Sequence, residues 1–256
     1  WYYVSKKAQT LSKYLASGDG GDEIFGGYTF RYKKFLETTN DLSKPIDKIK
    51  AYLNCHERDS VPDQDKLFNK NVNFSWDLIH KTLLPYFEND LDRLDQVLLA
   101  DYNGKLLYNF SPVNNSLHEY FGLNSISPFL SQDIISYLVP IQNKFKYYQK
   151  DNIGKLLLRK LLQEYKADML VTNEKLGFNV NTQDLWKRYG KQLCEKYLID
   201  GQIIKNNIIN NDWISCYIDK KNLEIRYVNK FLGLLAVEIW YRLFITKEMD
   251  SNTTLD

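Results

Sequence analysis

The sequence predicts a chain of mixed α/β class that is mostly α-helical after a short remnant of a parallel-sheet layer. Residues 2–14 and 23–36 carry apolar side chains at helical spacing. Between them, Leu15 and Ala16 form a short apolar stretch that we interpret as the end of a strand. The glycine-rich run 17–22 follows directly. A helix, a strand end, a glycine turn and a second helix are typical of one unit of an α/β layer.

Beyond about residue 40 the apolar spacing is helical throughout. We therefore expect residues 1–40 to be the end of the α/β layer and residues 41–256 to form a mainly helical region. The helices expected there begin at Pro45 or cover 91–102, 153–165 and 227–244, with a loop at 206–211.

Composition excludes several classes of protein. Lys and Arg total 34 against 32 Asp and Glu, and this near balance argues against a nucleic-acid partner. The most apolar stretch, 231–237, is too short to span a bilayer, so we expect no membrane partner. The three cysteines are odd in number and far apart, which predicts reduced thiols in a cytoplasmic protein. No histidine pair has zinc-ligand spacing.

The segment 17–28, SGDGGDEIFGGY, is the most informative part of the chain. A strand that ends in a glycine turn and feeds a helix exposes backbone N–H groups to an anion. Asp19 and Asp22 lie in the same turn, and carboxylates beside a phosphate suggest a magnesium ion between them. No Lys-Ser/Thr follows the glycines, so this is not a Walker A loop. A structural alternative remains open, in which Asp22 or Glu23 only caps the helix.

This string resembles the signature SG(E/D)GxDE(L/I)FGGY of the asparagine synthetase family, and weaker landmarks follow in the family's order. Residues 127–130 resemble its SPFLD segment, and residues 154–159 resemble its GKxxLR helix. Residues 174–178 match its KxGF loop, and 232–244 look like its closing helix. The resemblance covers nearly the whole chain, but only the first motif is specific by itself.

The resemblance implies an adenine-nucleotide α-hydrolase-like synthetase domain, of which residues 1–40 would be the end of the nucleotide-binding layer. It implies a ligase that uses ATP and Mg²⁺ to adenylate a carboxylate, expected to be that of aspartate. Pyrophosphate leaves, and ammonia from glutamine then attacks the activated carbonyl to form the amide. Members of the family also contain a glutaminase domain.

Carried over by motif, the resemblance assigns a role to each of five residues. The backbone at Ser17 and Gly18 would line the adenylate, and Asp19 would orient and deprotonate the incoming amine. Asp22 would hold the magnesium-pyrophosphate, and Lys175 would neutralise developing charge.

Three other charged residues receive weaker interpretations. The role of Glu23 is open between the site and first-turn capping. Lys155 and Arg159 are interpreted as charges on the helix face rather than as ligands.

The chain also departs from the family pattern. The pyrophosphate loop SGGxDS does not occur in it, and the chain begins at Trp1. We therefore expect a C-terminal part of the synthetase domain, inactive alone, with its glutaminase domain, its pyrophosphate loop and the other strands of its parallel sheet upstream. Charged family residues are replaced by neutral ones at Asn115, Ser116, Asn124, Ile126, Ser131 and Asn173.

These departures leave two alternatives to an aspartate-amidating ligase. One is an adenylating relative of the β-lactam synthetases that acts on another carboxylate, and the other is a non-catalytic paralogue. For partners, we expect small-molecule substrates and leave a homodimer open.

Overall fold

The computed structural model describes all residues except 43, 57, 59, 172–179 and 256. The chain divides into two compact units. The first contains residues 1–55 and 82–175, and the second contains residues 56–81 and 176–256. The expected division near residue 40 remains a prediction.

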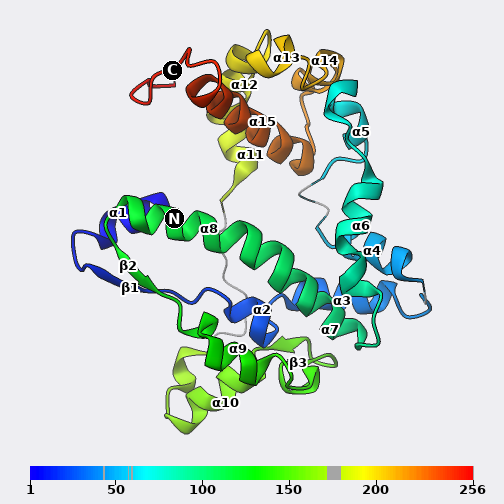
Figure 1. Cartoon of the computed structure of the whole chain (residues 1–256), viewed down its shortest axis with the longest axis vertical. Helices are drawn as coiled ribbons and strands as arrows, with labels where there is room; N and C mark the ends of the chain where they lie inside the picture. Colours follow the sequence, from blue (N-terminus) through cyan, green and yellow to red (C-terminus); the bar gives the residue numbers. More distant parts are fainter. Residues whose placement is uncertain (43, 57, 59, 172–179, 256) are drawn as a thin grey trace. The chain divides into compact units, whose positions relative to one another are not determined.

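The first unit holds most of the segments singled out in the sequence (Figure 1). Its α-helices are α1 (Tyr2–Ala8), α2 (Gly21–Phe25), α3 (Thr29–Thr38), α4 (Pro45–Asn54), α7 (Arg93–Ala100), α8 (Ser111–Tyr120), α9 (Gln132–Leu138) and α10 (Leu156–Glu164). Its strands are β1 (Tyr14–Ala16), β2 (Asn124–Ile126), β3 (Tyr147–Tyr148) and β4 (Ile153–Gly154). Shorter turns of helix are η3 (Pro128–Leu130), η4 (Asn143–Phe145) and η5 (Asp168–Leu170), and η2 (Asp101–Phe110) is a π-helix.

The strand expected at Leu15 and Ala16 is present and has a parallel partner within the chain. Strand β1 pairs in parallel with β2, with Leu15 opposite Ser125 and Ala16 opposite Ile126. This partner lies downstream, more than 100 residues along the chain, and the further strands expected upstream remain a prediction. The sequence did not predict β2, because three residues are too few to show an alternating pattern.

The single helix expected over 23–36 is wrong. Helix α2 ends at Phe25, and α3 begins at Thr29. Gly26 adopts a left-handed conformation with φ of 76°, and the Gly27 N–H donates to the Asp22 carbonyl. A left-handed residue closes a helix and turns the chain, which only glycine does at little cost.

Two clusters form the core of the first unit. The larger one packs aromatic residues of α3 and α4 against α7, with Tyr32, Phe35 and Phe87 almost wholly buried. The smaller one joins Ile24 and Phe25 of α2 to Leu138 of α9. Helix α7 continues through η2 into α8 without leaving the right-handed helical conformation (Figure 1). This long helical segment provides one wall of the region around α2.

The second unit is built from helices. They are α5 (Gln64–Leu67), α11 (Thr182–Leu185), α12 (Lys191–Leu198), α13 (Gln202–Lys205), α14 (Asn211–Ile218) and α15 (Ile225–Phe244), with the shorter η1 (Lys70–Val72) and the π-helix η6 (Trp186–Gly190). Helix α6 (Trp76–Phe87) crosses from this unit into the first. The core centres on Trp213, Ile214 and Phe231.

Most of the later helices were predicted from spacing. Helix α4 begins at Pro45 as expected, because proline suits the first helical position. The helix expected over 227–244 is α15, and the loop expected at 206–211 is present up to Asn210. The helix expected from residue 153 begins three residues later, since Ile153 and Gly154 pair with β3 instead.

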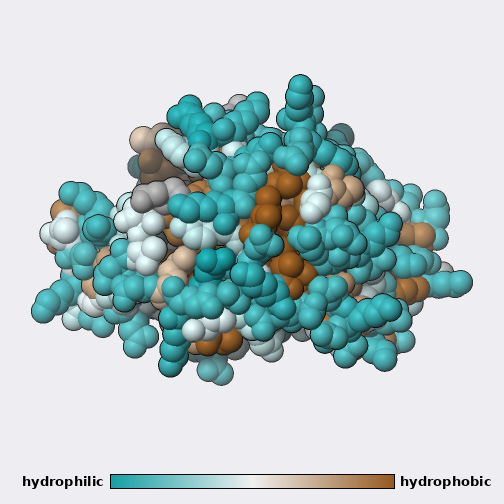
Figure 2. Space-filling view, turned by 90° about the horizontal axis from the view of Figure 1, so that it is seen from above, coloured by the Kyte–Doolittle hydropathy of each residue, from teal (hydrophilic) through white to brown (hydrophobic). Residues whose placement is uncertain are grey.

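The face of the molecule seen in Figure 2 is mostly hydrophilic, with hydrophobic residues in small patches and a narrow strip among the hydrophilic ones. Among the described residues, none of the helices combines the length and the apolar character that a bilayer crossing requires. All three cysteines lie in described segments, and none forms a disulfide.

Candidate active site

The glycine-rich loop and the SPFL segment meet at one edge of the two-stranded sheet. Ser17 follows β1 and Ser127 follows β2, and the strands are parallel. Both segments therefore leave the sheet at its carboxyl edge, where α/β proteins bind ligands. The two serine Oγ atoms lie 2.9 Å apart. The Ser17 N–H also donates to the Ile126 carbonyl at 2.9 Å, which fixes the start of the loop.

The glycines let the SPFL segment pack closely against the loop. Gly20 has φ of +85°, and a Cβ there would lie 2.4 Å from the Leu130 side chain. A Cβ on Gly21 would contact the Phe129 ring at 3.4 Å. By contrast, nothing lies within 4 Å of the Cβ position of Gly18. The backbone at Gly18 thus borders open space, which a ligand can occupy.

Asp19 is held by a residue from the long helical segment. Its Oδ2 accepts a hydrogen bond of 3.1 Å from the Nδ2 of Asn114 in α8. Asn114 is 3% exposed, whereas Asp19 is only half-buried. A buried amide that donates to a half-buried carboxylate fixes the direction in which the carboxylate faces.

Asp22 forms an ion pair with Lys155, which lies just before α10. The Nζ–Oδ1 distance is 2.8 Å, and both side chains are partly exposed. Gly27 makes room for this pair, because a Cβ on it would overlap Asp22 Oδ1. Neither Asp22 nor Glu23 caps α2, since Gly20 is the N-cap residue and no side-chain capping bond is present. Lys155 is the N-cap residue of α10 and pairs with Asp22, so it does not stand alone on the helix face. Whether it also contacts a ligand remains a prediction.

Glu23 points away from Asp22 into the protein. It is 3% exposed, and its Oε1 accepts a hydrogen bond of 2.6 Å from the Tyr28 hydroxyl. Burial raises the pKa of Glu23, and the bond from Tyr28 only partly offsets that effect. Arg31 and Lys105 stack over the Tyr28 ring at 4.2 and 4.0 Å from its centroid. The contacts of Tyr28 with Glu23, Arg31 and Lys105 hold α2 in place on the side that carries Glu23.

The residues expected to bind magnesium fit that ion only with help from a substrate. No group of three or more His, Cys, Asp or Glu side chains that could hold a metal occurs in the described parts of the chain. Mg²⁺ commonly binds through one or two carboxylates together with phosphate oxygens and water. Asp22 is such a single carboxylate, and Lys155 is its present partner.

Ser17, Gly18, Asp19 and Asp22 all lie in the loop after β1 and the first turn of α2. Their roles remain predictions. Lys175 and the whole KxGF segment lie outside the described residues. Sequence reasoning missed Asn114, because one polar residue in a helical segment carries no signal. Lys155 lies in the segment 154–159 that resembles the GKxxLR helix, but the sequence did not predict its ion pair with Asp22.

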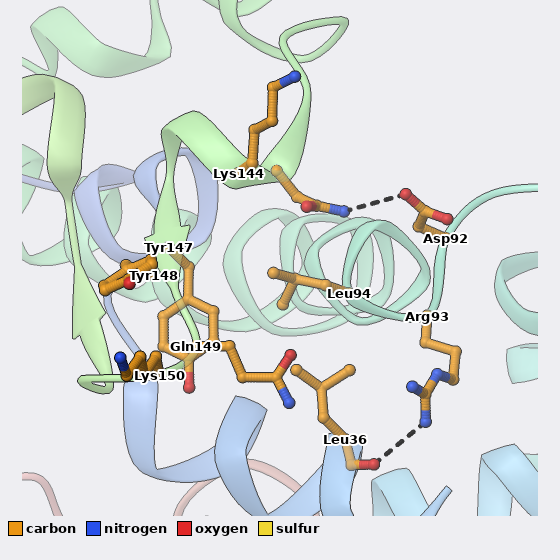
Figure 3. Close-up of a pocket in the computed structure, with 10 residues that line it drawn as sticks. Leu36, Asp92, Arg93, Leu94, Lys144, Tyr147, Tyr148, Gln149 and Lys150 are labelled. Carbon is orange, nitrogen blue, oxygen red and sulfur yellow. Dashed lines mark hydrogen bonds between the residues drawn. The ribbon is translucent and has the colours of Figure 1, made fainter. Parts of the chain in front are cut away.

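Another pocket in the first unit, of about 350 Å³, lacks a comparable arrangement (Figure 3). Arg93, Lys144 and Lys150 line it, but their charged ends point in different directions. Arg93 Nη1 donates to the Leu36 carbonyl at 3.1 Å and so is engaged within the fold. These cations do not converge on one anion.

Comparison with known proteins gives the same family as the motifs. A sequence model described as asparagine synthase matches residues 1–242. "Asparagine synthetase [glutamine-hydrolyzing] 1" of Bacillus subtilis (strain 168) is 23% identical over 284 residues. That alignment covers 96% of this chain but only 43% of the relative. No solved structure matches the chain significantly.

Proposed function

The chain belongs to the asparagine synthase family, and from this membership we propose that it is the part of an ATP-dependent carbon–nitrogen ligase that carries the second nucleotide-binding signature. The proposed reaction adenylates a carboxylate with ATP, releases pyrophosphate and forms an amide with ammonia from glutamine. The proposed acceptor is aspartate. The observation that carries the proposal is the set of contacts that distant segments make with this loop, in which Ser127 contacts Ser17, Asn114 contacts Asp19 and Lys155 contacts Asp22.

The loop supplies the adenylate site in this proposal. The open space beside Gly18 lets a nucleotide approach the backbone of Ser17 and Gly18. Asp19 faces the same loop and is oriented by Asn114, so it can accept a proton from the attacking amine. Its carboxylate must stay in one orientation for that step, since proton transfer requires hydrogen-bond contact.

Asp22 and Lys155 would together handle the pyrophosphate. Asp22 would hold the Mg²⁺, which when bound would supply positive charge to the pyrophosphate. Lys155, a flexible and partly exposed lysine, could then pair with a phosphate oxygen in place of Asp22. Lys175 remains the proposed second cation, which neutralises charge on the reacting oxygens.

The activity also needs parts that this sequence does not contain. The pyrophosphate loop SGGxDS is not found in the 256 residues. We propose that this loop and a glutaminase domain are supplied by further polypeptide, in the same chain or in another.

A side-by-side assay tests the proposal on the protein together with those parts. ATP–pyrophosphate exchange is measured with aspartate, with other carboxylates and without an acceptor, and amide formation is measured with glutamine or ammonia. Aspartate-dependent exchange together with asparagine formation is the expected result. Exchange with a different carboxylate would move the proposal to another acceptor. Nucleotide binding without any exchange would instead indicate a non-catalytic paralogue.

A further inference from the structure

A second cavity, of about 650 Å³, lies behind α2 on the side of Glu23. Its walls come from α2, α7, η2, α9 and the segment that follows α9. Most of the lining is aliphatic, and Ile24, Leu98, Leu99, Ile135, Val139 and Ile141 contribute to it. Its volume falls within the range of small-molecule sites, which are mostly apolar and contain a few polar groups that orient the ligand.

Two opposite charges line this cavity without pairing with each other. Lys146 is 4% exposed, and the hydrogen bond of its Nζ, to the Val139 carbonyl, is 3.4 Å long. Asp95 accepts one hydrogen bond of 3.2 Å, from Asn143 Nδ2. No ion pair within 4 Å joins Lys146 to Asp95, both of which lie in described segments. Both residues line the cavity, and each acts electrostatically on the other.

Both groups have hydrogen-bonding positions left for a ligand. Lys146 has three N–H donors, and its bond to Val139 uses one of them. The half-buried Asp95 carboxylate has two oxygens, of which one accepts the bond from Asn143. Burial lowers the pKa of Lys146 and raises the pKa of Asp95, and in each case the other residue offsets only part of the effect. The third charged residue of the lining, Glu23, already accepts the bond from Tyr28. Lys146 can thus pair with an anion in the cavity, and Asp95 with a cation.

We propose that this cavity binds a free α-amino acid with an apolar side chain. Its carboxylate pairs with Lys146, its ammonium pairs with Asp95, and its side chain fills the aliphatic part of the cavity. A zwitterion places its two charges a few ångströms apart, so it fits between groups that do not touch each other. This cavity and the proposed catalytic loop are separate sites, and α2 is the element that contributes residues to both. Ligand binding in the cavity does not depend on the proposed reaction.

Calorimetric titration tests the proposal, with L-leucine and L-phenylalanine as probes. The comparison ligands are 4-methylpentanoate, which lacks the amine, and 3-methylbutylamine, which lacks the carboxylate. We expect each comparison ligand to bind at least tenfold more weakly than leucine. Equal binding of leucine and either analogue, or no binding of any probe, would overturn the proposal.

Matched variants test whether leucine binds in this cavity. Lys146→Met and Asp95→Asn should each weaken leucine binding at least tenfold, whereas Lys144→Met and Asp92→Asn, at nearby exposed positions, should not. Leu99→Trp should also block binding, because it fills the cavity while leaving both charges in place. Thermal melts show whether each variant is folded. Leucine binding that survives Lys146→Met and Leu99→Trp would place the ligand elsewhere and end the proposal.

Discussion

Lys155 Nζ lies 2.8 Å from Asp22 Oδ1, which joins two motifs separated by more than 130 residues of sequence. The glycine at position 27 leaves the space in which this pair forms. Because both side chains are partly exposed, the pair contributes little to stability, at most about 1 kcal/mol. Its position beside the glycine-rich loop therefore has more bearing on ligand binding than on folding.

The Lys155→Met variant should distinguish the contribution of this ion pair to ligand binding from its contribution to stability. We expect aspartate-dependent ATP–pyrophosphate exchange to fall about 100-fold, since the variant removes a cation placed for developing phosphate charge. The free energy of unfolding should change by less than about 1 kcal/mol. Lys160→Met is the matched control, because Lys160 is an exposed lysine of α10, the helix that begins directly after Lys155. Equal loss of exchange in both variants would show that Lys155 has no special role.

The Asp19–Asn114 hydrogen bond allows the two half-reactions to be distinguished. Asn114→Ala should slow amide formation about 10- to 100-fold, because Asp19 then loses the donor that orients it. Exchange, which precedes amine attack, should stay near the wild-type rate. The exposed neighbour Asn115 provides the control, and Asn115→Ala should leave both rates unchanged. A parallel fall of exchange and amide formation in Asn114→Ala would contradict the proposed role of Asp19 in the second step.

The glycines of the first unit differ in how much space each leaves for a Cβ atom. A Cβ on Gly154 would lie 2.1 Å from the Gly26 carbonyl oxygen, and a backbone atom cannot easily move aside. Gly154→Ala should therefore destabilise the protein by about 1–3 kcal/mol. Gly104, in η2, has nothing within 4 Å of its Cβ position, so Gly104→Ala should be neutral or stabilise by up to about 1 kcal/mol. Chemical denaturation measures both, and similar effects would refute the packing argument.

The sequence predicted the segments whose signal is local. Pro45 marked a helix start because proline suits the first helical position. The apolar spacing of 227–244 was enough to find α15. The carboxylates of Asp19 and Asp22 were found because they lie three residues apart in one glycine-rich turn.

What the sequence did not predict depends on contacts between distant segments. Strand β2 exists because it pairs with β1, and its three residues carry no pattern of their own. Gly26 ended α2 where the apolar spacing continued, since a left-handed glycine can stop a helix whatever follows it. Asn114 became a candidate only once the fold placed its amide against Asp19.

The second unit contains a carboxylate whose surroundings predict a pH-dependent stability. Asp63 accepts hydrogen bonds from Tyr217, Trp213 and Tyr227 at 2.7, 3.0 and 3.1 Å. Burial alone would raise the pKa of Asp63, but these three donors outweigh that effect and lower it. Because the pKa is lower in the folded state, the ionised carboxylate stabilises the fold above the unfolded-state pKa of about 3.9. That stabilisation is lost as the pH falls through the folded-state pKa.

Asp63→Asn should remove this contribution. At pH 7 we expect the variant to be less stable than the wild-type protein by about 1–2 kcal/mol, as for the loss of charge-assisted hydrogen bonds at a partly exposed site. The difference should shrink below about pH 4, where the wild-type carboxyl also becomes protonated. Asp65→Asn, at an exposed position in the short helix α5 that follows Asp63, is the control and should show no such pH dependence. The measurement is urea denaturation of the three proteins between pH 3 and pH 7. A stability difference that stays constant over this range would show that the aromatic donors do not favour the charged form of Asp63.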